Sequence, residues 1–135
     1  MFNLDINQVM DKGWKAADVH DIPPIKDSWS KGWHSVRHFF EITGFGVNAA
    51  TKNKGESLTP EHDELESKQQ ELFVVMEGKV EFCLDKKSFI GTPGCMLSVA
   101  PQVKRSAKAL ETPTTLLIIG GAPGQIYKIQ GWEKV

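Results

Sequence analysis

Short strand-like runs recur at regular spacing from Trp33 onward, and this spacing constrains the fold more than any other feature of the 135-residue sequence. Each run is rich in β-branched or aromatic residues and is followed by turn residues such as Gly, Pro, Asn or Asp. No segment after Trp33 carries a sustained 3.6-residue apolar stripe, so the pattern predicts an all-β sandwich or barrel. The predicted strands are 36–42, 45–50, 72–76, 79–84, 96–99, 106–110 and 115–119.

Two of the intervening segments are typical of tight hairpins. Glu77-Gly78 supplies a glycine between two apolar runs, and 85–87 (Asp-Lys-Lys) separates the next pair. We therefore expect hairpins at both positions.

Residues 1–32 differ from the rest of the chain. Gly13 and the pair Pro23-Pro24 exclude a long helix, although 5–14 can form a short one. The segment carries Trp and Ile side chains that need cover. We interpret 1–32 as an N-terminal arm and 33–135 as the single folded barrel, with the arm or an exposed strand edge joining two copies into a homodimer.

The balance of charge excludes several classes of partner. Sixteen Lys and Arg against 17 Asp and Glu give a formal charge of −1, with no basic stripe for a nucleic acid. The sequence shows no secretory signal and no apolar run of about 18 residues, so we expect a cytoplasmic protein that does not contact a membrane. Cys83 and Cys95 are expected to stay reduced.

The stretch 55–82 is the most informative for function. A polar loop with many potential metal ligands runs into an apolar strand, a glycine and a second strand. Glu71 and Gly78 resemble the E(x)6G half of the first motif of the cupins, and Gly94 resembles the anchor of their second motif. The resemblance covers roughly 37–121 and implies a cupin-type jelly-roll β-barrel. Features at 46–48, 62–64 and 120–124 also resemble a subgroup of small bacterial cupins with no settled activity.

The resemblance implies a metal site, because the first cupin motif holds a divalent metal through two histidines and a glutamate. Counting back from Glu71 places Glu64 and Glu66 in the histidine positions, whereas a longer loop places His62 and Glu64 there. We prefer the longer loop, which retains one imidazole and costs little entropy. His62, Glu64 and Glu71 are then the candidate ligands of one Fe(II), Mn(II) or Zn(II) ion.

The histidine position of the second motif falls on Arg105, or on Ser106 in a frame shifted by one residue. A guanidinium cannot ligate a cation and repels it. Arg105 can instead pair with Glu71 or Glu64 and offer its other donors to an anion. We therefore take Arg105, Glu71 and Phe73 as candidate ligand-binding residues.

Three functions are compatible with this pattern. The first is a small-molecule-binding protein with a degenerate metal site at the barrel mouth, binding a small anionic metabolite. The second is a divalent-metal-dependent cupin enzyme of dioxygenase or isomerase type, and the third is a purely structural or partner-binding barrel. No residue is assigned a catalytic role.

Other notable residues have simpler interpretations. His34 and His38 lie in the segment WHSVRHFF and share one face of the expected strand. They are about 13 Å apart on that strand, which is too far for both to bind one metal ion. A solvated or edge role is therefore expected for them and for Arg37. His20 is expected to be exposed. Alternation predicts these core residues: Phe39, Phe73, Val75, Phe82, Met96 and Leu117.

Overall fold

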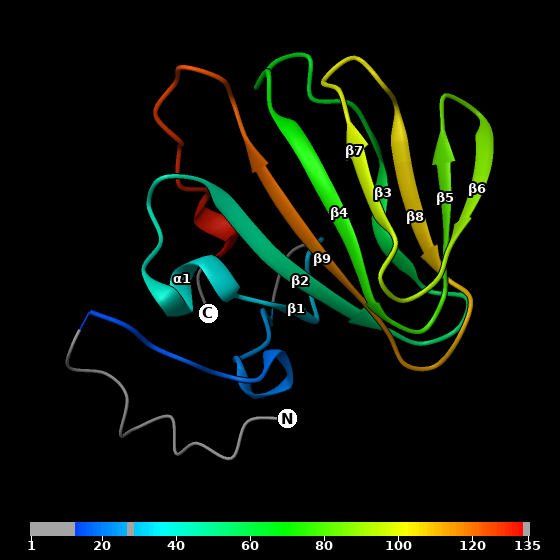
Figure 1. The fold of residues 1–135 in the computed structure, drawn as a ribbon, viewed down its shortest axis with the longest axis horizontal. Coiled ribbons are helices and arrows are strands. Elements are labelled where there is room, and N and C mark those ends of the chain that lie inside the picture. Colours follow the sequence, from blue (N-terminus) through cyan, green and yellow to red (C-terminus); the bar gives the residue numbers. More distant parts are fainter. Residues whose placement is uncertain (1–12, 27–28, 134–135) are drawn as a thin grey trace.

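The computed structural model describes residues 13–26 and 29–133, which form two antiparallel sheets facing each other (Figure 1). One sheet has the strand order β1-β2-β9-β4-β7 and the other β3-β8-β5-β6. The strands are β1 (Trp33–His34), β2 (Gly46–Lys52), β3 (Ser57–His62), β4 (Gln70–Glu77), β5 (Val80–Leu84), β6 (Lys87–Gly91), β7 (Met96–Val99), β8 (Arg105–Ala109) and β9 (Thr114–Gly121). Short helical segments are η2 (Val19–Asp21), α1 (Val36–Phe40) and η3 (Gly131–Glu133).

The main core lies between the two sheets. Phe73 and Val75 on β4 face Val80 and Phe82 on β5, and all four are almost fully buried. Their alternation along each strand confirms the predicted core at Phe73, Val75 and Phe82.

The all-β prediction is confirmed, whereas a closed barrel is not. Among the described residues the two sheets do not pair along their edges, so the arrangement is two packed sheets. The N-terminal arm also stays a prediction, because 1–12 and 27–28 lie outside the described residues. The same holds for the short helix expected at 5–14, of which only the last two residues are described.

One predicted strand and one predicted hairpin need correction. Residues 36–42 form helix α1 and the turn after it, because a helix packs Val36 and the neighbouring phenylalanines against a second apolar cluster and sends Arg37 into the interior. Glu77-Gly78 is not a hairpin, since β4 and β5 belong to different sheets. Gly78 makes the corner between them at φ 78°, where a Cβ would meet Pro113 O at 2.5 Å.

The second expected hairpin is confirmed. β5 pairs directly with β6, and Asp85 and Lys86 take the positive φ values of 47° and 71° that a two-residue connection of this hand requires. Three strands were not anticipated: the short β1, β3, which contains Pro60, and the short β6.

His34, His38, His20 and Arg37 differ in their exposure to solvent. His34 is buried, with Nδ1 3.1 Å from Ile22 O and Nε2 2.8 Å from Thr51 Oγ1, so a solvated role is wrong, whereas its strand β1 does lie at the edge of its sheet. The same correction applies to buried Arg37, while His38 is exposed and His20 is exposed as expected.

The remaining expectations concern apolar and sulfur-containing side chains. Met96 is 63% exposed, so its core assignment is wrong, because β7 turns that side chain outward. Phe39 and Leu117 are partly buried against the second cluster. Cys83 and Cys95 are free. No helix within the described ranges is long and apolar enough to cross a bilayer.

Candidate functional site

A cavity of about 450 Å³ opens between the two sheets. Its polar end is formed by His62, Glu64 and Glu71, and Phe73 lies in its wall. An aromatic side is made by Trp29, Trp33 and Trp132, and a third side comes from the C-terminal segment through Tyr127, Gln130 and Glu133.

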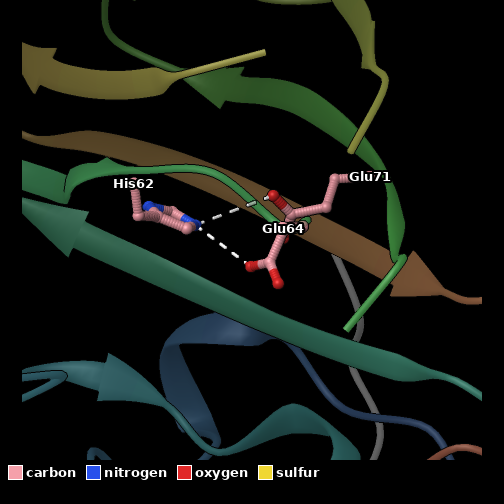
Figure 2. A group of neighbouring side chains, drawn as sticks. All are labelled: His62, Glu64 and Glu71. Carbon is pink, nitrogen blue, oxygen red and sulfur yellow. Dashed lines mark ion pairs between the residues drawn. The ribbon is translucent and has the colours of Figure 1, made fainter. Parts of the chain in front are cut away.

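The polar end is assembled from both sheets (Figure 2). His62 is the last residue of β3 and Glu71 the second residue of β4, while Glu64 lies in the loop that joins them. That loop is held in place because Glu64 N donates to Pro101 O at 2.9 Å and Lys68 N donates to Glu64 O at 2.7 Å. One ligand atom from each of the three side chains lies within 4.8 Å of the others.

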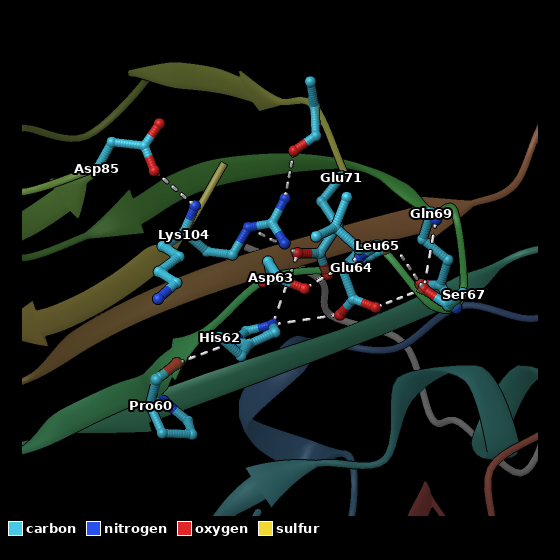
Figure 3. A network of polar contacts seen from close by, with 12 residues as sticks. Pro60, His62, Asp63, Glu64, Leu65, Ser67, Gln69, Glu71, Asp85 and Lys104 are labelled. Atoms are coloured by element: carbon cyan, nitrogen blue, oxygen red, sulfur yellow. Dashed lines mark hydrogen bonds and ion pairs between the residues drawn. The ribbon is translucent and has the colours of Figure 1, made fainter. Parts of the chain in front are cut away.

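His62 is oriented by the backbone behind it. Its Nδ1 lies 2.7 Å from Pro60 O, and its Nε2 lies 3.2 Å from Glu64 Oε1 and 3.9 Å from Glu71 Oε1 (Figure 3). The hydrogen bond with Glu64 raises the pKa of His62 above 6.5, against the opposing effect of burial. The carbonyl of Pro60 accepts a hydrogen bond from Nδ1 and so keeps a proton on that nitrogen. When the imidazolium of His62 loses a proton, the proton therefore leaves Nε2, whose lone pair becomes available.

Glu64 and Glu71 have pKa values displaced in opposite directions. Burial works to raise the pKa of Glu64, but hydrogen bonds from His62 and from Ser67 Oγ, at 2.5 Å, bring it below 4.5. Burial raises the pKa of Glu71, and the neighbouring charge of Glu64 raises it further. Two carboxyls with divergent pKa values side by side are typical of sites that bind or move protons.

Arg105 lies behind Glu71 and not in the cavity wall. It is 1% exposed, its Nη2 donates to Ala100 O at 2.8 Å, and its Nε lies 3.6 Å from Glu71 Oε1. The expected pairing of Arg105 with Glu71 is therefore present as an ion pair. A direct contact between Arg105 and a ligand stays a prediction.

The donor set fits a divalent cation by type and spacing. One imidazole and two carboxylates are ordinary ligands of Fe(II), Mn(II) and Zn(II), and Glu71 Oε1 is a buried oxygen with no hydrogen-bond partner. The guanidinium of Arg105 stands against this, because its positive charge would weaken the affinity of such a site. Glu66, the ligand of the alternative registration, is exposed and lies outside the cluster.

Sequence reasoning missed the aromatic side of the cavity. Trp29, Trp33 and Trp132 form one cluster with ring centroids 4.8 to 5.7 Å apart. Trp33 and Trp132 are 99 residues apart in the sequence, so no local pattern joins them. The number of tryptophans, four in 135 residues, was the available signal.

A buried carboxylate in the C-terminal segment was also missed. Glu133 is 0% exposed and accepts hydrogen bonds from Arg37 Nε at 2.8 Å, Tyr127 OH at 2.6 Å and Asn48 Nδ2 at 3.2 Å. Burial, together with this bond to Glu133, raises the pKa of Tyr127. The network fixes the C-terminal segment as one wall of the cavity, and an acidic residue near a chain end gives no sequence signal for it.

Comparison with known proteins identifies the fold. A cupin protein from Bacteroides fragilis is similar to 93% of this chain and 98% of its own, with 18% identity and a TM-score of 0.65. The chain folds as a small cupin domain. A sugar phosphate isomerase of the cupin superfamily from Silicibacter pomeroyi is similar to 78% of this cupin domain and 74% of its own chain, with 20% identity and a TM-score of 0.63.

Other comparisons add little about activity. KdgF from Halomonas sp. is similar over 58% of this cupin domain and 68% of its own chain, with 15% identity and a TM-score of 0.53. No family model and no curated protein matches the sequence. At these identities the likeness establishes the cupin fold, and function has to be argued from the site.

Proposed function

We propose that this cupin domain binds a small organic molecule in the cavity between its sheets, with His62, Glu64 and Glu71 as the polar end of the site, and that binding needs no resident metal. A cavity of about 450 Å³ has the size of known small-molecule sites, which combine apolar walls with a few convergent polar groups. The tryptophans supply the apolar wall here, and the three charged residues supply the polar groups.

The charge balance of the polar end is the observation that carries the proposal. His62 and Arg105, two groups that can carry a positive charge, face the carboxyls of Glu64 and Glu71 through contacts of 3.2 to 3.9 Å. Buried charges are tolerated when they are paired. With His62 protonated and both carboxyls ionised, this cluster is neutral without a metal, whereas a dication would add two positive charges beside a guanidinium that cannot lose its proton.

A divalent-metal-dependent enzyme is the second candidate function. It is favoured by the spacing of the three ligand atoms, which lie within 4.8 Å of one another. His62, Glu64 and Glu71 would hold the ion, which would supply Lewis-acid chemistry at the polar end. Metal binding would first require His62 to lose its Nε2 proton, so the affinity would rise with pH.

The two candidates differ in metal content. Elemental analysis of protein purified without a histidine tag, followed by titration with Mn(II), Fe(II) and Zn(II), measures retention and affinity. Glu64→Gln and His62→Gln alter the cluster, while Glu66→Gln changes an exposed carboxylate in the same loop and is the matched control.

The proposal predicts well under one equivalent of metal in the wild type and in all three variants. About one tightly held equivalent that His62→Gln and Glu64→Gln lose and Glu66→Gln retains would overturn the metal-free site in favour of the enzyme.

A further inference from the structure

We propose that the molecule bound in the cavity carries hydrogen-bond-donating groups, amine or hydroxyl, and that the site discriminates against anions. This inference rests on the proposed function, because it assigns a ligand class to the same cavity. It departs from the anionic ligand that the sequence suggested.

Several hydrogen-bond donors of the cavity wall are already used within the protein. Trp33 Nε1 donates to Leu58 O at 3.0 Å, and Tyr127 OH donates to Glu133 at 2.6 Å. Ser67 Oγ donates to Glu64 at 2.5 Å, and both ring nitrogens of His62 face oxygens of the protein. An anion that took one of these donors would have to break the bond that the donor now makes.

Two buried acceptors of the same wall have no hydrogen-bond partner. They are Asn48 Oδ1 and Glu71 Oε1, and both residues line the cavity, whereas Arg105 Nε and Nη1, the unpartnered buried donors near Glu71, lie outside the lining. The orientation of Asn48 is fixed, because its Nδ2 donates to Glu133 and a flipped amide would turn its oxygen toward that carboxylate. Unpartnered buried acceptors are costly, so a ligand that brings donors gains the most by entering.

The charges reinforce this preference. Three carboxyls line the cavity, those of Glu64, Glu71 and Glu133, against one side chain that can carry a positive charge, His62, whereas Arg37 and Arg105 lie behind Glu133 and Glu71 and outside the lining. A phosphate or carboxylate would therefore meet glutamates before any arginine. Like charges placed side by side suppress the binding of the wrong partner.

The aromatic side suits the body of such a ligand. Trp29 and Trp132 line the cavity with ring centroids 4.8 Å apart, and Trp29 is about half exposed at its edge. Tryptophan rings bury apolar carbon and attract cations over their faces. The same wall accepts a neutral carbon skeleton or a protonated amine.

A matched series of four probes tests the ligand class. Benzylamine, benzyl alcohol, benzoate and benzylphosphonate share one apolar body and differ in head group. Binding to the full-length protein is followed by isothermal titration calorimetry and by quenching of tryptophan fluorescence. Trp132→Leu serves as the control for location, because it removes part of the cavity wall and should weaken all four.

The variant Glu71→Gln distinguishes recognition of an amine from recognition of a hydroxyl group. Glu66→Gln, which changes an exposed carboxylate, is the control. If the charge of Glu71 recruits an amine, Glu71→Gln weakens benzylamine roughly tenfold and leaves benzyl alcohol nearly unchanged. If the ligand is recognised only through the hydrogen bond that it donates, Glu71→Gln leaves the affinities for benzylamine and benzyl alcohol similar to each other.

The outcomes for the ligand class and for the proposed function are distinct. We expect benzylamine or benzyl alcohol to bind about tenfold or more tightly than benzoate and benzylphosphonate. Tighter binding of either anion, with the effect of Trp132→Leu retained, would overturn the ligand class and leave the cavity as the binding site. Absence of binding by all four probes would overturn the proposed function itself.

Discussion

Arg37 Nε lies 2.8 Å from Glu133 Oε2 in the interior of the protein, with side chains 3% and 1% exposed. The pair joins α1 to the C-terminal segment across 96 residues of sequence. Arg37 Nη1 also donates to Ile42 O at 2.8 Å, and Ser35 Oγ donates to Glu133 O. One wall of the cavity is thus fixed by the contacts of a single buried carboxylate.

Glu133→Ala should lower the free energy of unfolding by about 3–5 kcal/mol, because it leaves the charge of Arg37 buried without a partner. Urea denaturation followed by circular dichroism measures the loss. Glu111→Ala, which removes a carboxylate that is about half exposed in its pair with Lys79, is the control and should cost under about 1 kcal/mol. Equal losses for the two variants would contradict the assigned role of Glu133.

The hydrogen bond between His62 and Glu64 should be visible in the titration of the imidazole. The pKa of His62 in the wild type is expected above 6.5, and Glu64→Gln should lower it, because the largest raising interaction is removed. Nuclear magnetic resonance of the histidine ring carbons measures this pKa. Glu66→Gln should leave it unchanged, and an unchanged value in Glu64→Gln would refute the contact.

The same pair should affect stability over a defined range of pH. The folded-state pKa of His62 lies above 6.5, so its contribution is complete below pH 6.5 and is lost as pH rises through the raised value. The folded-state pKa of Glu64 lies below 4.5, so its contribution is complete above pH 4.5 and is lost as pH falls through the lowered value. The difference in Tm between wild type and His62→Gln should therefore be largest between these two pH values.

The ion pair between Arg105 and Glu71 can be isolated by a double-mutant cycle. Arg105→Met should destabilise the fold at neutral pH by about 3–5 kcal/mol, because it leaves ionised Glu71 buried without its guanidinium. Adding Glu71→Gln should restore part of the loss. The pKa of Glu71 is already raised by burial, so the cost of Arg105→Met should shrink at acidic pH as Glu71 becomes protonated.

No rescue by the second substitution would show that Arg105 acts through its packing and its bond to Ala100 O instead of through Glu71.

The core between the sheets provides a test of the fold. Phe82→Ala should cost about 3–5 kcal/mol, because Phe82 is 1% exposed and packs against Phe73 with ring centroids 5.8 Å apart. Met96→Ala should change the stability by less than about 0.5 kcal/mol, because Met96 is 63% exposed. Chemical denaturation of both variants makes the comparison, and a larger effect at Met96 would contradict the assignment of inner and outer faces.

Strands with a clear alternation were predictable from the sequence, and those whose form depends on distant contacts were not. Phe73 and Val75 revealed β4 because their period of two is local. Residues 36–40 have a strand-like composition, yet they form a helix, because Arg37 pairs with Glu133 near the other end of the chain. Tertiary contacts of this kind override local propensity.

The candidate site was predictable to the same extent. The grouping of His62, Glu64 and Glu71 was predicted from the resemblance to the first cupin motif, in the registration with the longer loop, and their ligand atoms lie within 4.8 Å of one another. The tryptophan side and the Tyr127–Glu133 side come from segments far apart in the sequence, and only the packed structure joins them. The position of Arg105 behind Glu71 likewise depended on the packing of the two sheets.

The most direct test of the account is the binding of benzylamine by calorimetry before and after removal of divalent metals with a chelator. The account predicts one site per chain and the same affinity in both samples, because the polar end is charge-balanced without a metal. Loss of binding after chelation, with recovery on addition of Mn(II), Fe(II) or Zn(II), would contradict it.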